Sequence, residues 1–433
     1  PGLIPQPATA DAATREDIAQ TLFNRKGQVI VHGFDRPNLS LAISPKTDRK
    51  KQLTDFMEDV RGQSGIVYAL SRKNIEEFAA VLKAAGHNAL PYHAGLDAGL
   101  RFDTQERFMA EDGIVIVATI AFGMGIDKPD VRFVVHMNSP KNIEAYYQET
   151  GRAGRDGLPS DAMMIYGLDD AAMQRGWIEK SDAPDEQKRI EHQKLNSLLG
   201  LCEAASCRRQ ILLSYFGDEG EPCGNCDNCD TPPAMFDATI AAQKALSAVY
   251  RTGQRFGVGY LISVLLGKSD ARMEKFGHDK QSTFGIGEEF SKASWQNIFR
   301  QLVALNLLRV DVTGHGGLSI TPQGSNFLRE KEPLNLREIS KQVADKSSKT
   351  RSRSAPAELK NEADKTLFEN LKAARAALAK KANVPAYVIF HDKTLIEIAK
   401  AKPQHLEEML EISGIGQAKL DKYGASFLSV IHD

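Results

Sequence analysis

The sequence has no apolar run long enough to cross a membrane. Its longest uncharged apolar stretch, Gly113 to Ile126, falls short of the roughly 18 to 20 residues that a membrane-spanning helix needs. Residues Pro1 to Ala13 lack the basic and apolar regions of a secretory signal, and the first residue is not Met. We therefore expect a protein without membrane segments, whose natural chain starts before Pro1.

Neither sign of charge is in excess. Lys and Arg number 55 and Asp and Glu 56, so the formal net charge is -1 and any nucleic-acid site must be local. Hydrophobic residues make up 42% and charged residues 26%, which is ordinary globular usage. This composition excludes wholesale disorder, collagen-like repeats and a disulfide scaffold. The 433 residues predict about two to four domains.

Short β-branched runs alternate with helical stretches between Ser64 and Gly167. This alternation is the βαβ signature of a parallel sheet. The runs Ile114 to Ala118 and Val131 to His136 are apolar on both faces, as expected of strands that helices cover on each side. We predict an α/β domain with a parallel sheet at residues 35 to 168.

The segment before this domain, residues 1 to 34, is too short to form its own core. Its pattern predicts one helix, Ala8 to Arg25, and one strand, Val29 to Val31, as the last piece of a missing domain. After the α/β domain, helical patterns lead into a cysteine cluster and end at Pro232 and Pro233. We predict a separate module at 169 to 233.

The remaining chain divides into three parts. Between 234 and 330, three helical patterns precede two short strands joined by TGHGG, an order that resembles a winged helix. The segment Ser291 to Leu308 is interpreted as holding the recognition helix, and the helical spacing of Trp295, Ile298, Phe299 and Leu302 predicts a buried core face, with a base-stacking platform as the alternative. Residues 331 to 355 include KQVADKSSKTRSRS, which has no apolar period and predicts a basic linker. Residues 356 to 433 are helical throughout and predict a small all-α domain. Its GIG segment, Gly414 to Gly416, either holds a DNA phosphate through backbone N–H groups or is a tight turn between helices.

Four of the five cysteines follow the pattern C-x15-C-x2-C-x2-C, at Cys207, Cys223, Cys226 and Cys229. Four thiolates suit tetrahedral zinc, and we favour a structural Zn²⁺ site. An iron–sulfur cluster also takes four cysteines, and a pair of disulfides is the third alternative. Cys202 is interpreted as an ordinary helix residue.

The segment YYQETGRAGRDG, Tyr146 to Gly157, places Arg152 and Arg155 among glycines after a helical run. Arginine offers a planar fork of donors that matches phosphate oxygens, so the segment predicts a phosphate-facing loop. The alternative is a surface loop whose arginines are solvated.

Three further segments, IVYALSRKNIEE, YHAGL and ATIAFGMGIDKPDVRFVVH, precede this one in order. Together they resemble motifs IV, V and VI of the second RecA-like lobe of superfamily 2 helicases, and specifically of the RecQ family. The cysteine pattern, with CRRQILLSYFG around its first member, is similar to the RecQ zinc module. Residues 356 to 433 resemble the helicase-and-RNase-D C-terminal (HRDC) domain. The resemblance implies the C-terminal two-thirds of an ATP-dependent DNA helicase that unwinds duplex DNA in the 3′ to 5′ direction, in recombination and repair.

The resemblance also implies two sets of site residues. Arg155 corresponds to the arginine finger of the interlobe ATP site, and its expected neighbours there are Arg152, Gln148, Asp127 and Gly125. Contacts to DNA phosphates are expected from Ser71, Arg72, His93 and Thr119. Thr119 has the alternative of a strand-end hydroxyl that caps the next turn. His315, at the tip of the TGHGG hairpin, either wedges against a duplex end or is a turn residue that tolerates positive φ.

The nucleotide-binding loop of such a motor is missing from the sequence. No Gly-rich loop ends in Lys and Ser or Thr, because the Leu266 to Ser269 segment has Ile262 where a glycine is needed. Asp185 to Lys188 lacks the His and the preceding strand of an acidic magnesium motif. Only PATADAATREDI, Pro7 to Ile18, is similar to the first lobe. We expect no ATP hydrolysis by this chain alone, and the competing hypothesis is a non-enzymatic zinc and winged-helix DNA-binding module.

The implied cofactors are structural Zn²⁺ in this chain, and ATP with Mg²⁺ in the intact enzyme. The implied partners are single-stranded and duplex or forked DNA, and a single-strand-binding protein that docks on the winged helix. The implied location is the bacterial cytoplasm, on the nucleoid.

Overall fold

The structure is a computed structural model. It describes residues 19–22, 33–123, 126–310, 317–330, 332–338, 359, 361–382 and 384–432. His315, Gly125, the strand predicted at Val29 to Val31 and most of the basic linker lie outside these residues, as does the helix predicted at Ala8 to Arg25 except for 19–22.

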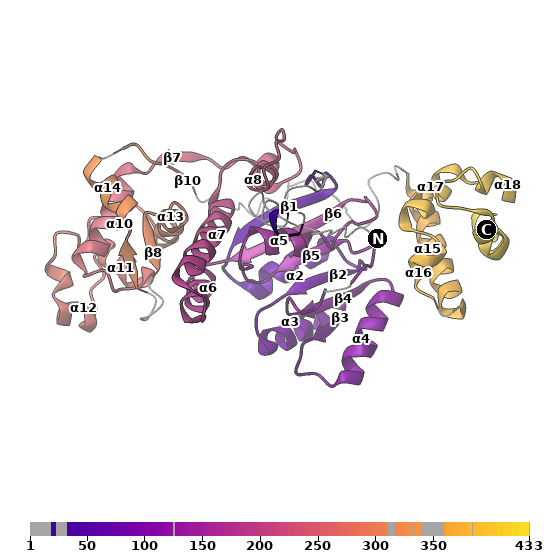
Figure 1. The fold of residues 1–433 in the computed structure, drawn as a ribbon, viewed down its shortest axis with the longest axis horizontal. Coiled ribbons are helices and arrows are strands. Elements are labelled where there is room, and N and C mark those ends of the chain that lie inside the picture. The colour runs from indigo at the N-terminus through magenta and orange to yellow at the C-terminus, as the bar shows by residue number, and fades with distance from the viewer. Residues whose placement is uncertain are drawn as a thin grey trace. The chain divides into compact units, whose positions relative to one another are not determined.

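The chain forms two compact units. One contains Arg36–Asn138, Gln148–Ile165 and Lys346–Asp433, and the other contains Pro1–Asp35, Ser139–Tyr147 and Tyr166–Asp345. The first unit holds most of the α/β lobe and the terminal helices, and the second holds the cysteine cluster and the winged-helix region (Figure 1).

A six-stranded sheet with strand order β1-β6-β5-β2-β4-β3 forms the α/β lobe. Its strands are β1 (Leu39–Pro45), β2 (Gly65–Tyr68), β3 (Asn88–Tyr92), β4 (Ile114–Ala118), β5 (Phe133–His136) and β6 (Ser160–Tyr166). β2 pairs in parallel with β4 and β5, β4 with β3, and β5 with β6. β4 and β5 are buried along their whole length. The predicted parallel sheet is confirmed.

Four helices connect these strands: α2 (Arg49–Asp59), α3 (Arg72–Ala84), α4 (Ala98–Ala110) and α5 (Ile143–Thr150). The apolar residues of α3 recur at helical spacing, so one face of the helix is buried against the sheet. On that face Phe78 and Leu82 join a core with Val117 of β4. Each such side chain contributes about 1.5–3 kcal/mol when fully buried.

The cysteine cluster lies in a helical segment. Its helices are α6 (Leu168–Lys180), α7 (Asp185–Glu203), α8 (Arg208–Tyr215) and the short α9 (Asp227–Asp230). The carboxyl end of α7 and the amino end of α8 are close together, because Arg208 donates to the carbonyls of Leu201 and Cys202 at 2.5 and 3.1 Å.

The predicted winged-helix region contains a helical group and a hairpin. Its helices are α10 (Thr239–Arg251), α11 (Val258–Leu265), α12 (Ala271–Phe276), the 3-10 turn η1 (His278–Lys280), α13 (Lys292–Ala304) and α14 (Pro322–Glu330). β8 (Leu308–Val310) and β9 (Leu318–Ile320) pair antiparallel, as predicted. β7 (Met235–Asp237) pairs with β10 (Asn335–Arg337), which lies within the predicted linker and is tied to the start of this region.

The predicted apolar stripe of α13 is buried in the core. Trp295, Ile298, Phe299 and Leu302 are all at most 1% exposed. The other side of α13 packs on α7, where Arg300 donates to Glu203 at 2.9 Å. Only Lys292, Ala293 and Gln296, near its first turn, are exposed. The core face predicted for this helix is confirmed. The sequence also suggested that this helix is the DNA-recognition helix, but most of its surface is covered by other parts of the chain.

The terminal segment is all-α, as predicted. Its elements are α15 (Glu362–Ala382), α16 (Ala386–Ile389), α17 (Asp392–Ala401), α18 (Leu406–Met409), α19 (Gln417–Lys419), the π-helical turn η2 (Leu420–Gly424) and α20 (Ala425–His432). Gly414 has φ +90°, and a Cβ there would lie 2.5 Å from the Thr394 hydroxyl oxygen. This close approach favours the interpretation of the GIG segment as a tight turn between helices.

Among the residues that the structure describes, no helix is both long enough and apolar enough to cross a membrane.

Candidate zinc centre and phosphate-facing loops

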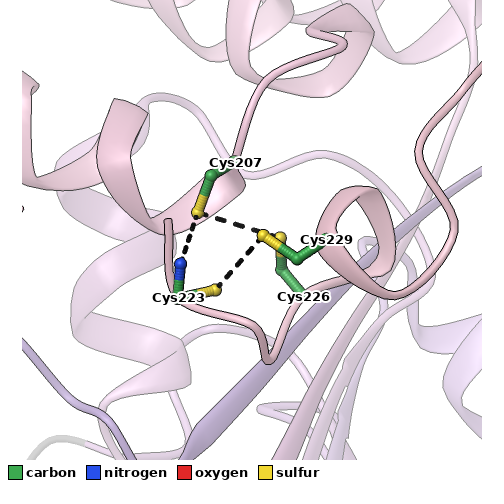
Figure 2. Close-up of side chains that lie close together, drawn as sticks. All are labelled: Cys207, Cys223, Cys226 and Cys229. Carbon is green, nitrogen blue, oxygen red and sulfur yellow. Dashed lines mark hydrogen bonds between the residues drawn. The ribbon is translucent and has the colours of Figure 1, made fainter. Parts of the chain in front are cut away.

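The four cysteines predicted as metal ligands come together. The sulfurs of Cys207, Cys223, Cys226 and Cys229 all lie within 4.8 Å of one another. Cys207 precedes α8, Cys223 lies in the loop between α8 and α9, and Cys226 and Cys229 lie at the start of α9 and on it. These three chain segments point their thiols at one centre (Figure 2).

The sulfur separations fit one tetrahedral ion. The Sγ atoms of Cys223 and Cys229 are 4.0 Å apart, as are those of Cys207 and Cys226. Zinc–sulfur bonds of about 2.3 Å in a tetrahedron place sulfurs roughly 3.8 Å apart. A disulfide needs about 2.05 Å, so the arrangement excludes the two-disulfide alternative for this conformation.

The backbone around Cys207 stabilises its thiolate form. Burial raises the pKa of the Cys207 thiol, but backbone N–H groups of Gln210 and Cys223 donate to its sulfur and lower the net pKa to about 7. Cys202, by contrast, is fully buried, and burial raises the pKa of its thiol to about 12. Cys202 lies outside the four-sulfur cluster, as its interpretation as a helix residue predicts. Burial also raises the pKa of the Cys223 and Cys226 thiols, so the distances between the sulfurs, and not the thiol pKa values, identify the candidate ligands.

Arg208 and Asn228, which lie close to the clustered cysteines, hold the cysteine-bearing loop in place by hydrogen bonds. These contacts were not predicted from the sequence. Arg208 is 1% exposed and forms a bidentate pair with Asp227, with N–O distances of 2.9 and 3.0 Å. Asn228 donates to the carbonyls of Ala204 and Ser206, each at 2.8 Å. The sequence signal was present, since Arg208 and Asp227 each directly follow a predicted ligand.

The two predicted arginine positions meet the loop that follows β4. Arg152 donates to the carbonyl of Gly123. Gly123 has φ +134°, and a Cβ added there would lie 2.4 Å from the Arg152 guanidinium carbon. Only glycine permits this approach.

Arg155 contacts the same loop three residues farther along. It donates to the Ile126 carbonyl at 2.9 Å and pairs with Asp127, whose side chain is 86% exposed. Gln148 is an exposed residue of α5, the helix that leads into the arginine loop. The structure thus brings Arg152, Arg155 and Asp127 together.

A buried pair beneath these loops escaped sequence reasoning. His136 Nε2, at the end of β5, lies 2.7 Å from a carboxylate oxygen of Glu149 on α5. The Tyr68 hydroxyl donates to the Phe122 carbonyl at 3.1 Å, and burial raises the pKa of Tyr68 far above its usual value. These contacts join the loop after β4, and the helix α5 that leads into the arginine loop, to the sheet. His136 and Glu149 lie within the segments ATIAFGMGIDKPDVRFVVH and YYQETGRAGRDG, but no sequence pattern indicated that their side chains pair.

The predicted DNA-contacting residues follow three neighbouring strands, β2, β4 and β3. The Ser71 hydroxyl accepts from the backbone N–H of Asn74 at 3.1 Å and caps α3. Thr119 directly follows β4, and its carbonyl accepts from Phe122 at 3.0 Å. His93, only 3% exposed, accepts from the Gly95 N–H through Nδ1 at 3.2 Å. Carboxyl ends of parallel strands form one edge, so these residues lie along a single edge of the sheet.

Arg72 extends this set. It is exposed, and its side chain approaches a Cβ position built on Gly95 to 3.0 Å, next to His93. The edge therefore carries an exposed cation and two hydroxyls, which suit phosphate contacts, whereas His93 is buried with its Nε2 3.3 Å from a carboxylate oxygen of Glu76.

Family comparisons match nearly the whole chain. The Helicase conserved C-terminal domain matches residues 48–157, the RecQ zinc-binding domain 168–230, the RQC domain 232–345 and the HRDC domain 364–431. The chain is 40% identical over 429 residues to the ATP-dependent DNA helicase RecQ of Haemophilus influenzae and spans 68% of that protein. The chain belongs to the RecQ helicase family. The cysteine centre described above falls within the RecQ zinc-binding domain.

Other RecQ relatives show the same extent of similarity. The RecQ helicase of Pasteurella multocida is 41% identical over 429 residues, and the chain covers 66% of its length. That of Bacillus subtilis is 34% identical over 425 residues, with 69% covered. The chain thus spans about two thirds of the length of these RecQ proteins, and the four-cysteine cluster supports structural zinc in this member of the family.

Proposed function

We propose that this chain supplies the second motor lobe and the DNA-engaging domains of an ATP-dependent 3′ to 5′ DNA helicase that acts in recombination and repair. The observation that carries this proposal is the convergence of Arg152 and Arg155 on the loop after β4. A guanidinium in such a loop can stabilise charge on a transferring phosphoryl group. ATP and Mg²⁺ are the cofactors we propose for the intact enzyme.

In this function Arg155 is the arginine finger, and Arg152, Gln148, Asp127 and Gly125 complete its surroundings. Asp127 holds Arg155 in this chain by an ion pair, and its own exposure leaves the pair open to exchange. When ATP approaches, the Arg155 fork would transfer from Asp127 to phosphate oxygens. Ser71, Arg72, His93 and Thr119 would hold the phosphates of single-stranded DNA, and His315 would meet the duplex end.

The test is the Arg155→Ala substitution in the enzyme that includes an ATP-binding lobe. DNA-stimulated ATP hydrolysis should fall by about 10³ to 10⁵, while DNA affinity stays within twofold. Arg107→Ala is the matched control, because Arg107 is an exposed arginine of the same lobe paired with Glu111. Unchanged turnover in Arg155→Ala would refute the finger assignment.

A second candidate is a non-enzymatic DNA-binding module, which the absence of a Gly-Lys-Thr loop in this sequence favours. We expect no ATP hydrolysis by the 433-residue chain alone. If the enzyme with an ATP-binding lobe were also inactive but bound forked DNA, this second function would replace the first. By resemblance to RecQ proteins, we also propose a single-strand-binding protein as a partner and the bacterial nucleoid as the place of action.

A further inference from the structure

The winged-helix region has a cluster of stacked aromatic rings that the proposed function does not use. Phe256 stacks on Tyr260 with ring centroids 4.2 Å apart, and Phe276 stacks on His278 at 5.7 Å. The Tyr260 hydroxyl lies 2.7 Å from His278 Nδ1, which ties the two stacks together. These residues come from the start of α11, the end of α12 and η1. We call this set the aromatic cluster.

Two exposed arginines lie over the aromatic cluster. The Arg255 guanidinium carbon is 5.4 Å from the Phe256 ring centroid and 5.2 Å from that of Phe276. That of Arg272 is 5.3 Å from the Phe256 centroid and 5.5 Å from the Tyr260 centroid. Cation–π contact of this kind orders a guanidinium while leaving its N–H edge free to donate.

Neither arginine forms an ion pair within the part of the chain that the structure describes. Of the three nearby acids, Asp270 accepts from the Met273 N–H at 2.7 Å and Glu274 from the Ser269 hydroxyl at 3.5 Å, and Asp279 has a buried carboxylate oxygen without a hydrogen-bond partner among the described residues. Lysines 268, 275 and 280 are also exposed along the same segment. The arginines are therefore ordered cations without a carboxylate partner, an arrangement that suits binding of an external anion.

The cluster adjoins the β8–β9 hairpin. Leu318 of β9 donates to the Phe256 carbonyl at 2.9 Å, and Ile320 donates to the Gln254 side chain at 2.9 Å.

The helix α13, which the sequence suggested as the recognition helix, is a poor alternative surface for DNA contact. On α13, Asn297 and Gln301 are buried and donate to the Arg337 carbonyl.

We propose that Arg255 and Arg272 form a phosphate clamp for the backbone of duplex DNA, so that this domain holds DNA by its α11–α12 and hairpin side instead of by α13. The clamp rests on the proposed DNA-binding function and specifies the surface. Phosphate of a duplex backbone fits better than an acidic peptide, because the exposed lysines 268, 275 and 280 add further cations along the segment, which matches the repeated charges of a duplex backbone. Such contacts carry no sequence preference.

The experiment measures binding of the 433-residue chain to a labelled blunt duplex by fluorescence anisotropy across a salt series. Loss of each phosphate contact reduces the slope of log affinity against log salt by about 0.9. The Arg255→Gln/Arg272→Gln double variant should therefore have a slope shallower by about 1.8, equally for unrelated duplex sequences. In each single variant the slope should be shallower by about 0.9. The single variants therefore test the clamp even if the double variant folds poorly.

Two controls separate charge from folding. Arg255→Lys/Arg272→Lys keeps both charges and should keep the parent slope. Arg189→Gln removes an exposed arginine that is paired with Glu186 on α7, and it should also leave the slope unchanged. If every folded glutamine variant had the same salt slope as the parent chain, the clamp proposal would be wrong. This would hold even if those variants no longer bound an acidic peptide. If the parent chain bound no DNA at all, the proposed function itself would fail, which is a different result.

Discussion

Two cysteines five residues apart, Cys202 and Cys207, have opposite chemical environments. Cys202 is a fully buried residue of α7, and burial raises the pKa of its thiol to about 12. Cys207 lies just before α8 and receives backbone N–H donors, and its thiol has a pKa of about 7. Cys207 belongs to the four-sulfur cluster and Cys202 does not, so the same side chain packs in the core at one position and is a candidate zinc ligand at the other.

This difference predicts the results of two substitutions. Cys223→Ser should abolish zinc retention and unfold the module, because metal binding supplies about 10–16 kcal/mol in small zinc-folded peptides. Cys202→Ala, the matched control, should keep about one zinc per chain and cost no more than about 2 kcal/mol of unfolding free energy. Metal analysis and thermal unfolding measure both outcomes. If Cys223→Ser kept its zinc and its unfolding temperature, the four-cysteine site would be wrong.

The carboxyl end of α7 joins two parts of the chain. Its last residue, Glu203, is 3% exposed as a side chain and pairs with Arg300 of α13 and Arg337 of β10, each at 2.9 Å. The preceding carbonyls accept from Arg208, next to the metal ligand Cys207. One helix end thus connects the zinc centre with the winged-helix region.

Breaking this buried charge group should be costly. Glu203→Gln leaves two largely buried guanidiniums without a counter-charge and should lower the free energy of unfolding by about 3–5 kcal/mol. Glu186→Gln, on the same helix with its carboxylate at the surface, should change it by no more than about 0.5 kcal/mol. Urea titration compares the two. Equal midpoints for both variants would show that the Glu203 pairs contribute nothing to stability.

At the scale of the whole molecule, the metal should stabilise more than its own loop. The chain has two tryptophans, of which Trp295 is fully buried in the winged-helix region and Trp177 is 51% exposed on α6. A Trp177→Phe background therefore makes indole fluorescence a reporter of the winged-helix core. Because α7 links that core to the zinc centre, the two should unfold together.

We expect a chelator to lower the unfolding temperature that Trp295 reports. For a unit of 150–250 residues, each kcal/mol of stabilisation lost with the zinc should lower it by roughly 2–4 °C, and added zinc should restore it. Glu203→Gln should weaken this response, since it removes the link between the two parts. If neither chelator nor added zinc changed the unfolding temperature that Trp295 reports, coupling through α7 would be contradicted.

Much of the fold could be predicted because its signals are local. Short β-branched runs identified the parallel strands β2 to β5, and period-3.6 patterns identified the helices α3 to α5. The apolar stripe of α13 identified a buried face, but not what covers the opposite side. The covering helix, α7, lies about a hundred residues earlier in the sequence. Contacts over such separations leave no periodic trace.

By itself, the sequence determined the class of fold and predicted the grouping of the four cysteines and the position of the arginine loop, because spacing and residue chemistry constrain each of these. Tertiary structure decided which groups meet. It set Gly123 against Arg152, paired His136 with Glu149, and placed Arg255 and Arg272 on a shared aromatic cluster. The physical reason is that a charge or a ring has meaning only through its neighbours, and chain folding alone supplies those neighbours.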